Sequence, residues 1–178
     1  LLKCIQDEIK RGEFYRRKHK ASGVELCMRE NKITGLLHFI LNDRKLFRLV
    51  EKITGCAIGS FIGRVYRMRP GLNHYHEWHS DLSYRRVLGV SINLSTEVFQ
   101  GGSLQLRNLK TGKLVHEVAN TGFGDMIVFR IDQGLQHQVC RVQGTVDKIA
   151  YAGWFHSQPN YIFPLKSNLS RLKKIAST

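Results

Sequence analysis

The sequence has 178 residues, 42% of them hydrophobic, which is enough for one domain with a sizeable core. It contains no run of 18 or more apolar residues, so no transmembrane helix or membrane partner is indicated. Lys and Arg number 28 against 14 acidic residues, and the net charge of +14 favours anionic partners, such as phosphate- or carboxylate-bearing molecules or nucleic acid.

The cysteines are scattered along the chain without a C-x-x-C spacing, which argues against a zinc knuckle or a disulfide framework. We therefore interpret the cysteines as reduced thiols in a cytoplasmic protein. No signal-peptide pattern is present, but the sequence begins with Leu1 and not with Met, so an upstream targeting segment stays open. The four cysteines are Cys4, Cys27, Cys56 and Cys140.

Basic residues cluster in residues 10–20 and again at Arg171, Lys173 and Lys174. No nucleic-acid-binding motif accompanies them, so solvated helix faces are favoured over a nucleic-acid surface.

Residues 1–56 are predicted to be helical. Leu1, Ile5 and Ile9 repeat at the i, i+4 spacing of one helix face. Asp43 is a candidate N-cap for a later helix and Gly55 is its candidate stop. The apolar residues of this region lie just before Asp43 (Leu36, Leu37, Ile40 and Leu41) and between Asp43 and Gly55 (Leu46, Phe47, Leu49, Val50 and Ile53).

From Ala57 onward, short apolar or alternating runs are separated by turns that contain Gly and Asn. This spacing predicts seven or eight strands in a β-sandwich or jelly roll, with the helices packed on one sheet. The chain is read as a single domain, with residues 1–56 as helical support, 57–156 as the β core and 157–178 as a basic C-terminal tail. The expected strands are Phe61–Met68, Val87–Leu94, Gly102–Leu106, Leu114–Val118, Asp125–Phe129, Gln136–Val142 and Lys148–Phe155.

The tripeptide His79-Ser80-Asp81, followed much later by His137, carries the chemistry of the chain. Residues i and i+2 of a strand project to the same face, so His79 and Asp81 can hold one metal ion side by side. Two imidazoles and one carboxylate are the ligand set of non-haem Fe(II) oxygenases. His74 and His76 have the opposite parity and are expected to face away. A cupin-like site built on those two histidines is the alternative, and Tyr75 or Trp78 is expected to form pocket wall.

Four segments in order resemble the 2-oxoglutarate/Fe(II)-dependent oxygenases, in particular the prolyl-4-hydroxylase-like branch. A tyrosine-bearing strand precedes the H-x-D, an apolar strand precedes a "GGxL" motif, a "GDxxxF" motif follows, and a final "H-x-V…G…K…WF" ending closes the region. The resemblance covers residues 58–156. The segments are Phe61–Tyr66, Val90–Leu104, Gly124–Phe129 and His137–Phe155.

The resemblance implies a double-stranded β-helix that couples decarboxylation of 2-oxoglutarate to substrate oxidation by O₂, with release of succinate and CO₂. It places Fe(II) on His79, Asp81 and His137, and ascorbate is an expected reductant. Lys148 lies where the family carries the cation that pairs with the distal carboxylate of 2-oxoglutarate. A cation deep in a barrel needs an anionic partner, which supports that role. Arg141 is the alternative.

Further roles follow from motif position. Tyr66 and Asn93 are candidates for neutral hydrogen bonds to the co-substrate. The segment Tyr84-Arg85-Arg86 comes directly after the metal ligands, where it is expected to contact the substrate, because adjacent arginines can clamp a carboxylate or phosphate. Trp154 and Phe155 are expected in the core behind the metal, and Asp125 is expected to shape a turn with Gly122 and Gly124.

The predicted function is therefore hydroxylation of a C–H bond in a small molecule, an amino acid or a peptide, with an anionic substrate favoured by the charge. Halogenation is disfavoured because Asp81 retains the carboxylate ligand. Two alternatives remain at this point: a non-catalytic basic binding module on a degenerate fold, and a cupin-type metal enzyme that needs no 2-oxoglutarate.

Overall fold

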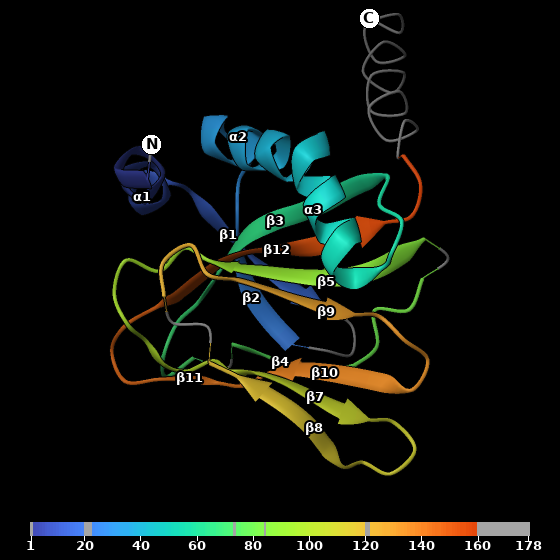
Figure 1. Cartoon of the computed structure of the whole chain (residues 1–178). Coiled ribbons are helices and arrows are strands. Elements are labelled where there is room, and N and C mark those ends of the chain that lie inside the picture. The colour runs from blue at the N-terminus through green and yellow to red at the C-terminus, as the bar shows by residue number, and fades with distance from the viewer. Residues whose placement is uncertain (1, 20–22, 73, 84, 120–121, 160–178) are drawn as a thin grey trace, which may run out of the picture.

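The computed structural model describes residues 2–19, 23–72, 74–83, 85–119 and 122–159. These residues form three helices and an extensive set of antiparallel strands (Figure 1). None of the described helices has the length and apolar character needed to cross a membrane. The elements are α1 (Leu2–Arg11), β1 (Phe14–His19), β2 (Gly23–Met28), α2 (Lys32–Leu41), α3 (Arg44–Thr54), β3 (Ser60–Met68), β4 (Tyr75–His79), β5 (Arg86–Asn93), β6 (Gln100–Gly101), β7 (Leu104–Asn108), β8 (Leu114–Val118), β9 (Met126–Arg130), β10 (Leu135–Val139), β11 (Val142–Gln143) and β12 (Lys148–His156).

The strands form one curled sheet with the order β8-β7-β10-β4-β2-β3-β12-β5-β9, while β1 pairs with β2 and β6 pairs with β11. In Figure 1 the strands β3, β12, β5 and β9 make an upper layer, and β4, β10, β7 and β8 make a lower layer. β2 pairs with β3 through Leu26 and Cys27 and with β4 through Gly23 and Val24, so successive parts of one strand join the two layers. This is the predicted double-stranded β-helix with supporting helices.

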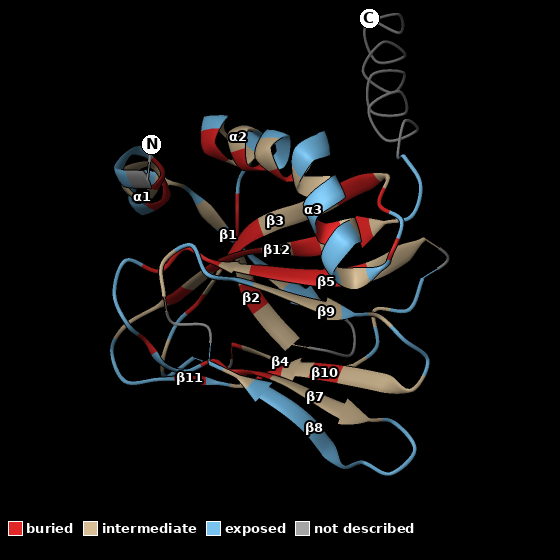
Figure 2. Ribbon diagram, in the orientation of Figure 1, coloured by how far each residue is buried: buried red, intermediate tan, exposed pale blue. Residues whose placement is uncertain are grey.

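The helices cover the outer face of the upper layer (Figures 1 and 2). Asp43 caps α3 by accepting hydrogen bonds from the backbone amides of Lys45 and Leu46, and Gly55 ends it in the left-handed conformation at φ 69°. Both predictions for this helix are confirmed. The hydrophobic core beneath includes Ile5, Ile9, Ile33, Leu37, Leu41, Val50, Phe61, Val65, Leu88, Tyr151 and Phe155.

The prediction that residues 1–56 are wholly helical is wrong between α1 and α2. The segment Phe14–His19 is a basic run without strand periodicity, and it becomes a strand by pairing along its length with β2. β2 in turn is fixed by its pairing with β3 and β4. Tertiary pairing therefore decides the structure of both strands against their weak local signals.

The later strands agree with the predicted order, with small changes at their ends. The expected strand Gln136–Val142 is divided into β10 and the short β11. β4 ends at His79, so Asp81 lies just beyond the strand and not within it. Asp125 shapes the predicted turn, because its Oδ2 accepts a hydrogen bond from the Gly122 amide at 3.1 Å. The predicted basic tail, residues 157–178, lies almost entirely outside the described residues.

Candidate metal and co-substrate site

Neighbouring strands bring the two histidines of the motif together. His79 on β4 is the antiparallel partner of His137 on β10, and their ring centroids are 4.2 Å apart. Asp81 follows directly after β4, and its Oδ2 lies 3.4 Å from His137 Nε2. One ligand atom from each of the three residues lies within 4.8 Å of the other two. No other metal-ligand group of this kind occurs in the part of the chain that the structure describes.

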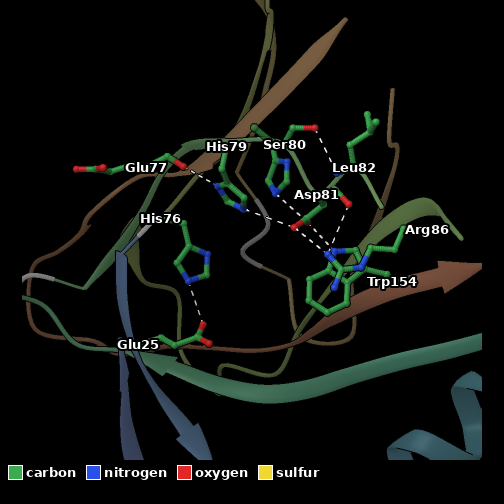
Figure 3. Close-up of polar contacts among 10 residues, drawn as sticks. Glu25, His76, Glu77, His79, Ser80, Asp81, Leu82, Arg86 and Trp154 are labelled. Atoms are coloured by element: carbon green, nitrogen blue, oxygen red, sulfur yellow. Dashed lines mark hydrogen bonds and ion pairs between the residues drawn. The ribbon is translucent and has the colours of Figure 1, made fainter. Parts of the chain in front are cut away.

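The two imidazoles are prepared for metal binding. His79 Nδ1 lies 2.6 Å from the backbone oxygen of Glu77, and a carbonyl can only accept, so Nδ1 carries the proton and Nε2 keeps its lone pair (Figure 3). Burial, and then the neighbouring His79, lower the pKa of His137 to about 4. His137 is therefore neutral at physiological pH. Both conditions fit a divalent cation held by two nitrogens and one carboxylate.

Asp81 is oriented from β12 and β5. Trp154 Nε1 donates a hydrogen bond to Asp81 Oδ2 at 2.6 Å, and an Arg86 Nη atom lies 3.5 Å from Asp81 Oδ1 (Figure 3). The expectation that Trp154 is a core residue behind the metal is therefore wrong, whereas Phe155 is fully buried in the core as predicted. The alternation of β12 explains the difference, because adjacent strand residues face opposite sides.

A cavity of about 250 Å³ opens beside these residues. Side chains from both layers and from β1 and β2 form its wall. The lining includes Arg17, Glu25, Arg64, Tyr66, His76, His79, Asp81, Arg86, Ser91, Leu104, Ile127, Phe129, His137, Lys148, Ala152 and Trp154.

Lys148 is a buried cation in this cavity, with 3% of its surface exposed. Its Nζ donates a hydrogen bond at 2.5 Å to the backbone oxygen of Gly102. Gly101 and Gly102 both have positive φ, 67° and 62°, and this turn brings the carbonyl to the ammonium group. No carboxylate of the described residues lies within ion-pair distance of Lys148. Burial lowers its pKa to about 8.

The alternative cation, Arg141, is exposed and does not line the cavity. Its guanidinium lies over the ring of Tyr75, 4.9 Å from the centroid. The geometry thus favours Lys148 over Arg141 as the partner of a co-substrate carboxylate.

The two neutral candidates differ in position. Tyr66 lines the cavity; burial, and then Glu25, raise the pKa of Tyr66 while a hydrogen bond with Ser91 lowers it, so the phenol stays protonated and can donate. Asn93 does not line the cavity. Its Nδ2 donates to the Gly122 oxygen and its Oδ1 accepts from the Ser95 amide, both at 2.9 Å. Asn93 therefore braces a turn, and the structure gives it no contact with a co-substrate.

The two arginines that were expected to bind the substrate differ in their position relative to the cavity. Arg86 lines the cavity and stacks on Trp154, 3.6 Å from the ring centroid. Arg85 does not line the cavity. Tyr84 lies outside the described residues.

A β-bulge overturns the parity argument for His76. The register between β10 and β4 shifts, so that His137 pairs with His79 while Val139 pairs with His76. Between these pairs one residue of β10, Gln138, opposes two residues of β4, Glu77 and Trp78, which places His76 on the same face as His79. His74 does face away, because its Nδ1 accepts from the Arg69 amide. With His74 directed elsewhere, the cupin-like pair has no geometric support.

The prediction that Tyr75 or Trp78 forms the pocket wall is wrong. Tyr75 and Trp78 both lie outside the cavity. The Tyr75 hydroxyl donates to Glu77, and the guanidinium of Arg107 lies over the Trp78 ring at 4.4 Å.

Sequence reasoning missed Glu25 on β2, which is 0% exposed and lines the cavity. Its Oε1 accepts from Arg64 Nε at 2.9 Å, and its Oε2 lies 3.0 Å from His76 Nε2 (Figure 3). Burial works to lower the pKa of Arg64, but the charge of Glu25 and its hydrogen bond outweigh this and raise it. A lone acid between Val24 and Leu26 was the only sequence signal.

The family model of the 2OG-Fe(II) oxygenase superfamily matches residues 63–156. The chain belongs to this superfamily. The matched range contains the His79, Asp81 and His137 group together with Lys148. Membership of the superfamily implies Fe(II) as the metal and 2-oxoglutarate and O₂ as co-substrates. No curated protein matches the chain significantly.

Solved structures of the superfamily share the fold. A Pseudomonas putida prolyl-4-hydroxylase superposes with a TM-score of 0.65 at 16% identity, covering 88% of this chain and 84% of that one. A 2OG-Fe(II) oxygenase-family oxidoreductase from Burkholderia pseudomallei gives 0.63 at 15% identity, covering 88% and 77%. A Trichoplax adhaerens prolyl hydroxylase, in complex with a hypoxia-inducible-factor peptide fragment, gives 0.62 at 16%, covering 88% and 76%.

Proposed function

We propose that this oxygenase hydroxylates a C–H bond of a small molecule, an amino acid or a peptide, with Fe(II) held by His79, Asp81 and His137. The observation that carries the proposal is the convergence of three ligand atoms within 4.8 Å, on a cavity that also contains a buried lysine with no carboxylate partner among the described residues. When bound, Fe(II) and 2-oxoglutarate supply the activation of O₂ and the release of succinate and CO₂.

The protein's own part is to bind and to orient. Lys148 would pair with the distal carboxylate of 2-oxoglutarate, and Tyr66 would donate to it from the same wall of the cavity. Trp154 and Arg86 fix the carboxylate of Asp81, while the Glu77 carbonyl fixes the tautomer of His79. The small side chains of Ser91 and Ala152 leave room between these groups. Arg86 is placed to contact a substrate that enters beside the metal.

We further propose a single oxygenase domain, because the helices pack on the outer face of the same sheet that lines the cavity. Its cysteines are all free, which is consistent with a cytoplasmic location. A reductant such as ascorbate would keep the iron in the Fe(II) state. The two alternatives, a degenerate binding module and a metal enzyme independent of 2-oxoglutarate, lack support, because the ligand group and the buried Lys148 are both intact.

The test is succinate formation from 2-oxoglutarate with Fe(II), O₂ and ascorbate, measured first without added substrate and then with a mass-shift screen of candidate substrates. Succinate should require Fe(II) and should be lost in His79→Ala. A matched control, His38→Ala, changes an exposed histidine of α2 and should retain the activity. Succinate formation that persists equally in His79→Ala would contradict the proposal.

A further inference from the structure

The hairpin β1–β2 adds charged groups to the cavity from outside the region that the family model matches. Arg17 on β1 and Glu25 on β2 are antiparallel partners, and both line the cavity. The matched region begins at residue 63, so neither residue belongs to it. Arg64, at the start of that region, lines the cavity beside them.

Glu25 organises this part of the wall and does not offer itself to a ligand. Its Oε1 accepts from Arg64 Nε at 2.9 Å and from Cys27 Sγ at 3.3 Å, while its Oε2 contacts His76 Nε2 at 3.0 Å. Both carboxylate oxygens are therefore engaged inside the protein. Arg64 is held through its Nε by Glu25, and its guanidinium carbon lies 5.7 Å from the centroid of the Trp154 ring, so its position is set before any ligand arrives.

The charges of the cavity do not balance. Four cations line it, Arg17, Arg64, Arg86 and Lys148, against two acids, Glu25 and Asp81, so these six side chains carry a net charge of +2. Fe(II) adds two positive charges and 2-oxoglutarate adds two negative charges, which leaves this excess unchanged. Confined charge of one sign favours binding of the opposite sign.

We propose that Arg17 and Arg64, with Arg64 held in place by Glu25, bind an oxyanion of the primary substrate, either a carboxylate or a phosphate. Planar guanidinium groups match both of these anions geometrically. The excess of two positive charges is the number that one phosphate dianion or two carboxylates would neutralise. The hairpin β1–β2 thus gives this oxygenase a specificity element of its own, and Glu25 acts as its positioning residue.

The experiment uses the full chain loaded with Mn(II) and 2-oxoglutarate without O₂, titrated with inorganic phosphate and, separately, with acetate. Calorimetry should detect one anion site at low salt. Arg64→Gln and Arg17→Gln should each weaken it by about tenfold or more, the loss of one charge-assisted hydrogen bond. The surface control Arg29→Gln, whose side chain is 66% exposed, should leave it unchanged. Tighter binding of phosphate than acetate indicates a phosphorylated substrate, and the reverse indicates a carboxylate.

Arg64→Gln leaves Glu25 without its arginine, so the double variant Glu25→Gln/Arg64→Gln removes both charges together and guards against loss of folding. It should bind Mn(II) and 2-oxoglutarate as the wild type does but should not bind the anion. The absence of any anion site in the wild type, or an anion affinity equal to that of the wild type in both Arg17→Gln and the double variant, overturns the inference. The inference rests on the proposed function, whose own failure is separately visible as failure of Mn(II) or 2-oxoglutarate to bind; that result overturns both.

Discussion

Two buried charges face the same cavity, and their surroundings differ. Glu25 on β2 has an arginine and a histidine within hydrogen-bond distance, so its charge is compensated within the protein. Lys148 on β12 donates to the Gly102 carbonyl and lies 5.5 Å from the centroid of the Phe99 ring, but no carboxylate of the described residues lies within ion-pair distance, and burial lowers its pKa to about 8. A buried charge is expensive unless it is paired. The compensated charge therefore organises the cavity wall, whereas the uncompensated one is a binding group for an anion.

The largest effect of a substitution is expected at the metal site, because the metal would bind the end of 2-oxoglutarate opposite the carboxylate that pairs with Lys148. Asp81→Ala removes the only carboxylate of the ligand group, so Mn(II) affinity should fall by more than about 100-fold, beyond the effect of losing an outer contact. Turnover should be lost. Calorimetric titration with Mn(II) checks this, and an unchanged affinity would exclude Asp81 as a ligand.

The compensated charge should matter for folding. Glu25→Gln leaves Arg64 in the cavity wall without its carboxylate, and the free energy of unfolding should fall by roughly 3 kcal/mol, the lower range for a broken buried pair because Arg64 keeps 24% exposure. Urea unfolding measures it. The control Glu117→Gln also removes a carboxylate with two side-chain hydrogen bonds, but one on an exposed strand, and should cost much less. Equal losses in the two variants would refute the distinction.

The uncompensated charge should appear in the pH dependence of stability. Lys148 has a pKa of about 8 in the folded protein, against 10.5 for an ordinary lysine. Between these values the unfolded state binds more protons, so stability rises with pH, by about 3 kcal/mol in total for this group. The wild type should therefore gain thermal stability relative to Lys148→Met from pH 8 to pH 10. Saturating Mn(II) and 2-oxoglutarate should reduce this gain, because a carboxylate partner favours the charged amine. Parallel pH profiles of the two proteins would contradict the account.

The support of Asp81 should give a smaller effect. Trp154→Phe removes the hydrogen bond to Asp81 Oδ2 but keeps an aromatic ring, so Mn(II) affinity should fall by about 10- to 100-fold. Trp78→Phe is the matched control, since Trp78 lies outside the cavity against Arg107. If both variants bind Mn(II) as the wild type does, the hydrogen bond contributes nothing to metal binding.

Much of this arrangement follows from local sequence. The caps at Asp43 and Gly55 mark α3 because they act on the helix's own backbone. The alternation of β12 leads from the motif ending to a buried Lys148. In each case the signal and its structural consequence lie within a few residues of each other.

The remainder depends on contacts between distant segments. Glu25 becomes a cavity residue because Arg64 and His76 come from two other strands, 39 and 51 residues away in the sequence. His76 faces the site because of a bulge in β4, and that bulge is visible only in the pairing register of β4 with β10. Asn93 has the expected motif position, yet the Gly122 turn takes its amide. Periodicity alone cannot show such long-range pairings.

The most direct measurement of the central distinction is the affinity for 2-oxoglutarate of the Mn(II)-loaded wild type, Lys148→Met and Arg141→Met. The account predicts that Lys148→Met loses about 1.5–3 kcal/mol of binding free energy, the value of a charge-assisted hydrogen bond, while Arg141→Met binds as the wild type does. Equal affinity in the wild type and Lys148→Met, or a loss confined to Arg141→Met, would contradict it.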